Sequence, residues 1–106
     1  MTDYVLIASR NRLEAADATH CFDLAEDLAA SGHTVTVFMV QNGVLTARGG
    51  AETLDAAAAA GVRLLADQFS LHERGISDGQ IHNSVLISPL DFVVDRLAAG
   101  DKVIWH

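Results

Sequence analysis

The chain has 106 residues, half of them hydrophobic, and a formal net charge of −7. This length predicts one domain, residues 1–106, that buries about two-thirds of the surface its unfolded chain exposes. The acidic balance disfavours nucleic acids and anionic membranes as partners. One cysteine cannot form an internal disulfide, and the N-terminal apolar run is too short for a signal peptide or a membrane span. We therefore expect a soluble cytoplasmic protein.

The first third of the chain predicts a strand, a helix and a second strand. Residues 4–8 (YVLIA) are a short apolar run typical of a buried strand. Residues 12–31 have apolar side chains on one side of a helical wheel and acidic ones largely on the other, and Gly32 ends the pattern. Residues 33–40 are rich in β-branched side chains, as strands are.

The strand predicted at residues 33–40 is apolar on both faces. Side chains alternate along a strand, so two sets point in opposite directions. A strand of this kind needs cover on both sides, which is typical of a parallel sheet between helices. The sets are Val35, Val37 and Met39 on one face and Thr34, Thr36, Phe38 and Val40 on the other.

Turn signals and further alternation follow this strand. Gln41-Asn42-Gly43 predicts a turn, and the pair Gly49-Gly50 predicts a loop or a helix start. The remaining elements are expected in this order: a helix at 51–60, a strand at 62–66, an irregular connection at 67–84 with one helical turn near 71–74, a strand at 85–87, a helix at 89–99 and a strand at 103–105. Strand–helix alternation predicts a three-layer α/β/α sandwich, with a site at the carboxyl edge of its parallel sheet.

An ordered set of segments carries a resemblance to a known family. These segments are YVLIAS, then HTVTVFMVQNGVLTARGG, then GVRLLADQFSLHERGI with its S-x-x-x-R-G pattern, and finally DKVIW. Together they cover almost the whole chain, and the chain resembles the DsrE-like family (DsrE, DsrF, DsrH and YchN-like proteins) of small sulfur-relay proteins. The resemblance implies a five-stranded parallel sheet of flavodoxin- or Rossmann-like topology, in the order 4-3-2-1-5.

The same resemblance implies a function and partners. It implies assembly as a homotrimer or hexamer and the passing of persulfide sulfur between proteins, with sulfurtransferases or sulfur carriers as partners. It also implies an acceptor cysteine just after the third strand, where this chain has Asp67. A carboxylate cannot hold sulfane sulfur, because persulfide chemistry needs a thiolate. We therefore expect an atypical or partner subunit, and whether it is an enzyme stays open.

Cys21 is the only thiol in the chain. The helical wheel places it within the apolar side of the helix predicted at 12–31, and free cysteine is among the most buried residue types. Reactive thiols need exposure and nearby positive charge, whereas Glu14 and Asp17 are acidic. We expect Cys21 to be buried and inert.

Asp67 is the first of the candidate site residues. It follows the third predicted strand directly, so we expect it at the carboxyl edge of the sheet as a catalytic residue. The alternative is an aspartate that caps its loop by accepting backbone N–H bonds from Ser70 or Leu71. Gln41 and Asn42 are expected to join Asp67 as ligand-binding residues, because their strand is its neighbour.

Five more residues complete the predicted crevice. Arg10, Glu14 and Asp17 are expected to reach the same edge from the start of the chain, and Arg74 from the connection after Asp67. Each could instead form a surface ion pair, and the acids could simply stabilise the first turns of their helix. Ser70 lies between Asp67 and Arg74 and is included among the ligand-binding residues.

His72 is the best general acid–base candidate among the five histidines, because it lies beside Glu73 and Arg74 in the loop after the third strand. A solvated loop histidine is the alternative. No histidine spacing indicates a metal site, and no glycine-rich phosphate motif is present, so we expect neither a metal nor a cofactor.

The helix predicted at 89–99 suggests a subunit contact. Its wheel places Leu90, Val93, Val94 and Leu97 toward the sheet and Phe92 on the far side. An exposed Phe92, together with Trp105 near the chain end, would be explained by contact with another subunit.

Three functions remain open from the sequence. One is an atypical sulfur-relay subunit. Another is a small-molecule-binding protein or acid–base enzyme that uses a crevice around Asp67, His72 and Arg74. The third is a purely structural oligomerising module.

Overall fold

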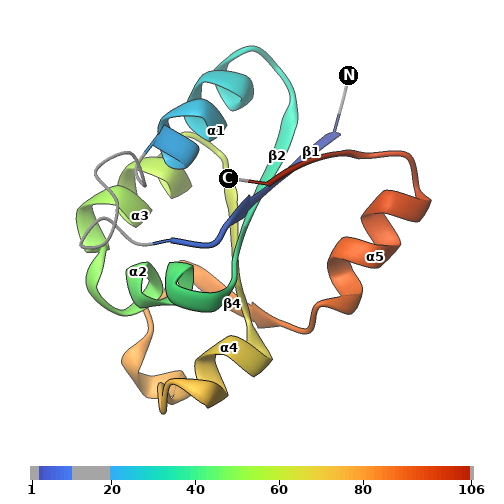
Figure 1. The fold of residues 1–106 in the computed structure, drawn as a ribbon. Helices are drawn as coiled ribbons and strands as arrows, with labels where there is room; N and C mark the ends of the chain where they lie inside the picture. Colours follow the sequence, from blue (N-terminus) through green and yellow to red (C-terminus); the bar gives the residue numbers. More distant parts are fainter. Residues whose placement is uncertain (1–2, 11–19, 106) are drawn as a thin grey trace.

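A computed structural model describes residues 3–10 and 20–105 of the chain (Figure 1). Five parallel strands form one sheet in the order β4-β3-β2-β1-β5, which confirms the predicted fold class and strand order. The strands are β1 (Asp3–Ala8), β2 (Thr34–Met39), β3 (Arg63–Asp67), β4 (Val85–Ser88) and β5 (Lys102–Trp105). The helices are α1 (His20–Ala30), α2 (Val44–Gly49), α3 (Ala51–Ala59), α4 (Gln68–Glu73) and α5 (Asp91–Ala98), with 3-10 turns η1 (Gln41–Gly43) and η2 (Asp78–Gln80).

β2 is the central strand, and both of its faces are buried as the alternation predicted. Val35, Val37 and Met39 belong to one core cluster, while Phe38 and Val40 belong to the other. The register places Phe38 beside Ile7 of β1 on one side and Leu65 of β3 on the other. Each strand in this row therefore contributes one large apolar side chain to the same face.

The two faces of the sheet are covered unequally (Figure 1). Helices α1, α2 and α3 pack on the face that carries Val35, which we call the three-helix face. Buried side chains from all three helices join its core, together with Leu71 of α4 at the carboxyl edge. The opposite face, the α5 face, is covered by α5 alone, whose Val93 is buried against Val5, Phe38 and Leu65. This second core is much smaller than the first.

The orientation predicted for α5 is right for Val93 but wrong for Leu90, Phe92, Val94 and Leu97. Phe92 and Val93 contact the sheet, and the Phe92 ring stacks on Phe38 with centroids 6.1 Å apart. Leu90, Val94 and Leu97 are exposed instead, by 54%, 60% and 57%. The helix has apolar side chains on both sides, so its wheel alone does not fix its orientation. The stacking of the partly buried Phe92 on the buried Phe38 fixes it, because an aromatic ring buries more area than an aliphatic side chain.

Two helical segments differ from the prediction. Residues 44–49, for which no helix was predicted, form α2, because Val44 and Ala47 pack into the three-helix core without exposure. The single turn expected near 71–74 is the end of α4, which begins at Gln68 because Asp67 caps it. Tertiary packing outweighed the glycine signals in the first case.

Gly43 lies where the chain passes close to β1. A Cβ atom built at this position would be 2.0 Å from the carbonyl oxygen of Ala8, closer than any real contact. The amide of Val40 donates a hydrogen bond of 2.9 Å to the same oxygen. The turn after β2 is thereby fixed against the end of β1.

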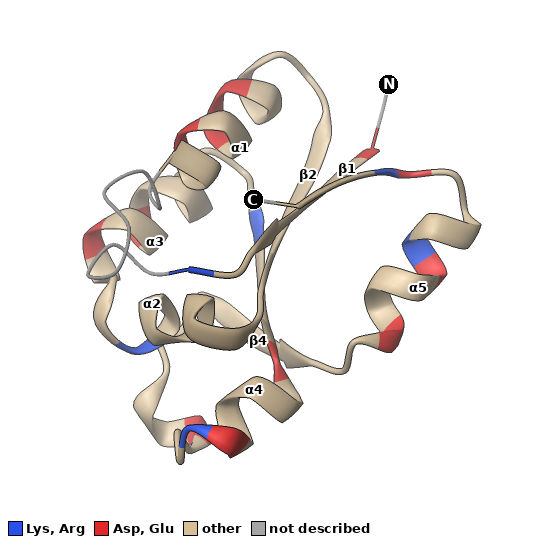
Figure 2. Ribbon diagram, viewed as in Figure 1, with Lys and Arg blue, Asp and Glu red and all other residues tan. Residues whose placement is uncertain are grey.

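None of the described helices has the length and apolar character needed to cross a membrane. The acidic residues lie mostly on exposed sides of α1, α3 and α5 (Figure 2).

Candidate functional site

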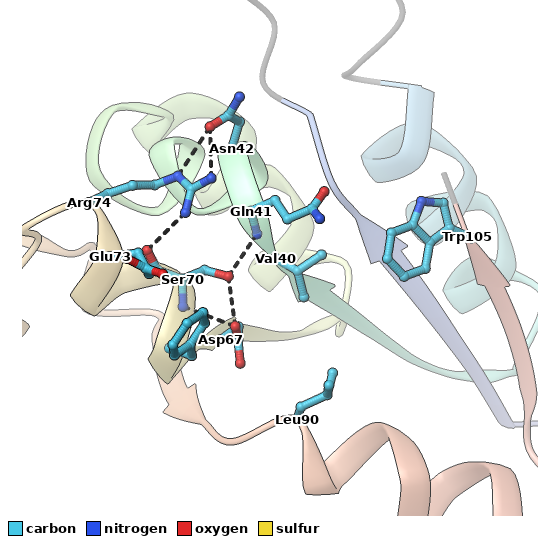
Figure 3. A pocket seen from close by; sticks show the side chains of 10 residues that line it. Val40, Gln41, Asn42, Asp67, Ser70, Glu73, Arg74, Leu90 and Trp105 are labelled. Carbon is cyan, nitrogen blue, oxygen red and sulfur yellow. Dashed lines mark hydrogen bonds between the residues drawn. The ribbon is translucent and has the colours of Figure 1, made fainter.

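An open crevice of about 710 Å³ lies at the carboxyl edge of the sheet (Figure 3). It is built from the ends of β2, β3 and β5, from α4 and from the residue before α5. The parallel strands bring these segments together, since their carboxyl ends meet at one edge. Its lining residues are Val40, Gln41, Asn42, Asp67, Phe69, Ser70, Glu73, Arg74, Leu90 and Trp105.

Asp67 is buried at the base of this crevice, with 7% of its surface exposed. Its Oδ2 accepts a hydrogen bond of 3.0 Å from the Ser70 amide and one of 2.7 Å from the Ser70 hydroxyl. This is the N-cap of α4, so the capping role considered for Asp67 is present in the structure. The other carboxylate oxygen points away from Ser70 (Figure 3), and no hydrogen bond links it to another described residue.

Ser70 links Asp67 to the turn after β2. The backbone amide of Gln41 donates to the Ser70 hydroxyl oxygen at 2.8 Å, and that hydroxyl in turn donates to Asp67. Gln41 has φ 51°, a left-handed conformation unusual outside glycine. Such backbone strain persists where surrounding contacts fix it, as the hydrogen bond to Ser70 does here.

Arg74 is fixed at the other end of α4. Its Nε and Nη2 atoms donate to Asn42 Oδ1 at 3.1 and 3.0 Å, and its Nη1 donates to the Ser70 carbonyl oxygen at 3.2 Å. The planar guanidinium is suited to holding one acceptor with two donors. Arg74 therefore ties α4 to the turn that carries Gln41 and Asn42.

The structure brings together five of the predicted site residues and leaves others apart. Gln41, Asn42, Asp67, Ser70 and Arg74 all line the crevice. His72 does not; it is exposed and lines a second cavity of about 450 Å³ with residues that include Gln68 and Asp78.

Of the three residues expected from the start of the chain, the structure describes only Arg10. Arg10 is exposed and is not among the residues that line either cavity. Glu14 and Asp17 lie outside the described residues.

Apolar lining residues were missed by the sequence reasoning. Phe69, Leu90 and Trp105 frame the crevice, and 67%, 54% and 63% of their surfaces are exposed. Leu90 and Trp105 follow or end strands of the same sheet, so the rule that located Asp67 could have located them too.

Cys21 is buried, as expected, with 1% of its surface exposed. Burial raises the pKa of the Cys21 thiol from 9.0 to about 12 by removing solvent from the charged form. At neutral pH the thiolate is therefore essentially absent, and the side chain behaves as a small apolar group of the three-helix core.

A second polar cluster joins α3 to the connection before β4. His82 Nε2 lies 2.9 Å from Asp55 Oδ1, and His82 Nδ1 lies 2.6 Å from the Ser84 hydroxyl. The Ser84 amide donates to Nδ1 at 3.1 Å, so Nδ1 accepts and Nε2–H donates to Asp55. Asp55 is largely exposed, and the cluster fixes this connection.

Within residues 3–10 and 20–105, no group of three or more histidine, cysteine, aspartate or glutamate side chains is arranged to hold a metal ion.

Comparison with known proteins agrees with the fold. The family model of the DsrE/DsrF-like family matches residues 3–106. The chain belongs to the DsrE/DsrF-like family. No curated protein sequence matches the chain significantly.

Solved structures show the same fold for this DsrE/DsrF-like protein. The ychN protein from E. coli superposes with a TM-score of 0.89 at 20% identity, over 100% of both chains. MTH1491 of Methanobacterium thermoautotrophicum, a protein of unknown function, gives 0.83 at 18% identity, also over 100% of both chains. BT1422 of Bacteroides thetaiotaomicron gives 0.79 at 11% identity, over 98% of this chain and 94% of the other.

Proposed function

We propose that this protein is a partner subunit of a DsrE-like sulfur relay that does not carry sulfur itself. Family membership supports a role in this chemistry, and the resemblance implies an acceptor cysteine at position 67. The observation that carries the proposal is the state of this position: Asp67 is a buried carboxylate, hydrogen-bonded to Ser70 at the end of β3. A carboxylate has no sulfur nucleophile to offer.

The remaining thiol supports the same proposal. Cys21 lies in the core of the three-helix face, away from the crevice, with a pKa raised to about 12 by burial. Sulfur transfer needs an accessible thiolate. The single cysteine also fits a reducing cytoplasmic compartment.

The acid–base alternative has weaker support. It relied on His72 acting beside Asp67 and Arg74, yet His72 lines the other cavity. A general base must lie within hydrogen-bond reach of the proton it removes.

Asp67→Cys tests the relay proposal. Wild-type protein, Asp67→Cys and the control Asp23→Cys are each incubated with glutathione persulfide, and sulfur addition is followed by intact mass. Asp23 is exposed on α1, on the opposite side of the sheet. We expect no addition to the wild type and faster, longer-lived persulfide on Asp67→Cys than on Asp23→Cys. A wild-type protein that takes up sulfur on Cys21 would contradict the proposal.

The partner of this subunit includes other copies of the chain. We propose a homotrimer or hexamer that covers the exposed apolar side chains of α5, together with recognition by a sulfurtransferase or sulfur carrier. Leu90, Val94 and Leu97 form a row on α5, and Leu86 of β4 on the same face is 63% exposed. Apolar groups gathered in this way are typical of subunit contacts.

Light scattering tests the assembly. We expect a trimer or its multiple for the wild type and a smaller species for Val94→Glu, which places a charge in the row. Glu52→Gln, an exposed position on α3, is the control and should leave the assembly unchanged. A monomeric wild type at micromolar concentration would contradict this proposal.

A further inference from the structure

We infer that the crevice binds an organic cation, an ammonium or guanidinium group carried on an apolar stem. This inference does not depend on the sulfur-relay proposal, because it uses the charges and walls of the crevice alone. The ligand is either a free small amine or the side chain of a lysine or arginine on a partner protein.

The free oxygen of Asp67 is the anchor. Both hydrogen bonds from Ser70 end on Oδ2, while the second oxygen points away from Ser70 and has no hydrogen bond from any other described residue (Figure 3). Asp67 lines the crevice with only 7% of its surface exposed. The second oxygen is not among the buried atoms that lack a partner, so it is open to the crevice. A cationic N–H is the donor that binds a partly desolvated carboxylate most strongly.

The charges of the crevice favour a cation. Asp67 and Glu73 line it, and Arg74 is the one basic lining residue. The Arg74 guanidinium already donates from all three of its nitrogens, to Asn42 and to the Ser70 carbonyl. The donors of Arg74 are thus engaged by neutral acceptors, and within the described residues it forms no ion pair with Asp67 or Glu73. Both lining carboxylates therefore remain available to a cation.

The walls favour an apolar stem. Phe69 and Trp105 are largely exposed aromatic side chains at the crevice, and Leu90 is a third apolar lining residue. Aromatic faces attract cations and also pack against methylene groups. The volume of about 710 Å³ has room for a group of this kind.

Calorimetric titration with matched probes tests the inference. Phenethylammonium is compared with neutral phenethyl alcohol and with anionic hydrocinnamate, which share its aromatic body. We expect binding of the ammonium at least about tenfold tighter than of the other two, since a charge-assisted hydrogen bond is lost in both. Equal binding of the alcohol, or preference for the anion, would overturn the inference, the latter by making Arg74 the anchor.

Variants locate the binding. Asp67→Asn retains a good N-cap residue and removes the charge, so we expect about a tenfold loss of phenethylammonium affinity. Asp23→Asn, the same change on α1, should leave affinity unchanged. Phe69→Leu alters an exposed side chain without affecting the core and should weaken binding several-fold. Unchanged affinity in both Asp67→Asn and Phe69→Leu would overturn the inference.

The source of the cation is distinguished with a second probe. Nα-acetyl-lysine N-methylamide carries its only charge on the side chain, as a lysine of a partner protein does. Binding of this probe with the same loss in Asp67→Asn would indicate a basic side chain of a partner. Binding of phenethylammonium alone would indicate a free small amine.

Discussion

The two faces of the sheet differ in how completely they are covered, and the site lies on the less covered one. Three helices close the three-helix face, and its core includes side chains such as Leu54 and Cys21 that are almost fully buried. One helix covers the α5 face and leaves Val94 and Leu97 exposed. The Asp67 side chain belongs to this second face, since it is two residues from Leu65 on β3. The larger core and the candidate site thus lie on opposite sides of one sheet.

The largest expected difference between the two faces is in the free energy of unfolding lost when a leucine is replaced by alanine. Leu54→Ala, on the three-helix face, removes a fully buried side chain and should lower the free energy of unfolding by about 3 to 5 kcal/mol. Leu97→Ala, on α5, should cost under about 0.5 kcal/mol in the dilute monomer. Urea denaturation measures both.

Protein concentration makes this comparison sharper. If copies of the chain cover the α5 face, the cost of Leu97→Ala should grow with concentration, whereas that of Leu54→Ala should not. If Leu97→Ala lowered the free energy of unfolding as much as Leu54→Ala at every protein concentration, the two faces would be packed alike.

Alkaline pH should act on the three-helix face through Cys21. The pKa of its thiol is about 12 in the folded protein and 9.0 when solvated, so between these values the unfolded chain releases a proton that the folded chain keeps. Stability is therefore retained below pH 9 and falls above it, by at most about 1.4 kcal/mol per pH unit. Cys21→Ala should reduce this slope; an unchanged slope would assign it to other groups.

Thiol labelling checks the same burial at neutral pH. A thiol reagent should react slowly with native protein and rapidly in urea, because unfolding exposes the sulfur. Rapid labelling of the native state would show that Cys21 is accessible and would restore it as a candidate sulfur carrier.

Asp67 should matter less for stability than for binding. Asp67→Ala removes the N-cap of α4 and the acceptor of the Ser70 hydroxyl, so we expect a loss of about 1 to 2 kcal/mol. Asp67→Asn, which can still accept the Ser70 amide, should cost only a few tenths of a kcal/mol. Thermal melts distinguish the two. A large loss for Asp67→Asn would indicate that the charge itself stabilises the fold.

The smallest expected effect is at the Asp55–His82 pair. Asp55 is 70% exposed at its side chain, and exposed ion pairs contribute little. Asp55→Asn should change the free energy of unfolding by under about 0.5 kcal/mol in urea denaturation. A loss several times larger would show that this cluster stabilises the three-helix face as strongly as its apolar core does.

The strands were predictable because their pattern is local. Side chains alternate along β2, which predicts Val35, Val37 and Met39 on one face and Phe38 and Val40 on the other. The structure places these two sets in the two cores. The site was predictable in part for a related reason: Gln41, Asn42 and Asp67 follow strand ends, and parallel strands end at one edge.

Other features depend on contacts that one segment does not encode. The orientation of α5 was decided by the stacking of Phe92 on Phe38, which is 54 residues earlier in the chain. His72 and Ser70 are only two residues apart, yet they line different cavities, since residues two apart on a helix do not face the same way. Their closeness in the sequence suggested that Ser70 and His72 belong to one site, but the helix directs them into two separate cavities.

The contact at Gly43 limits how this crevice can be redesigned. Any side chain at position 43 would meet the Ala8 carbonyl, so the turn would have to leave β1. That turn supplies both the Gln41 amide that binds Ser70 and the Asn42 oxygen that holds Arg74. Grafting the crevice residues onto another scaffold would therefore fail unless the glycine and the backbone of β1 were transferred with them. The close packing of Gly43 against Ala8 thus determines where Gln41 and Asn42 lie in the crevice.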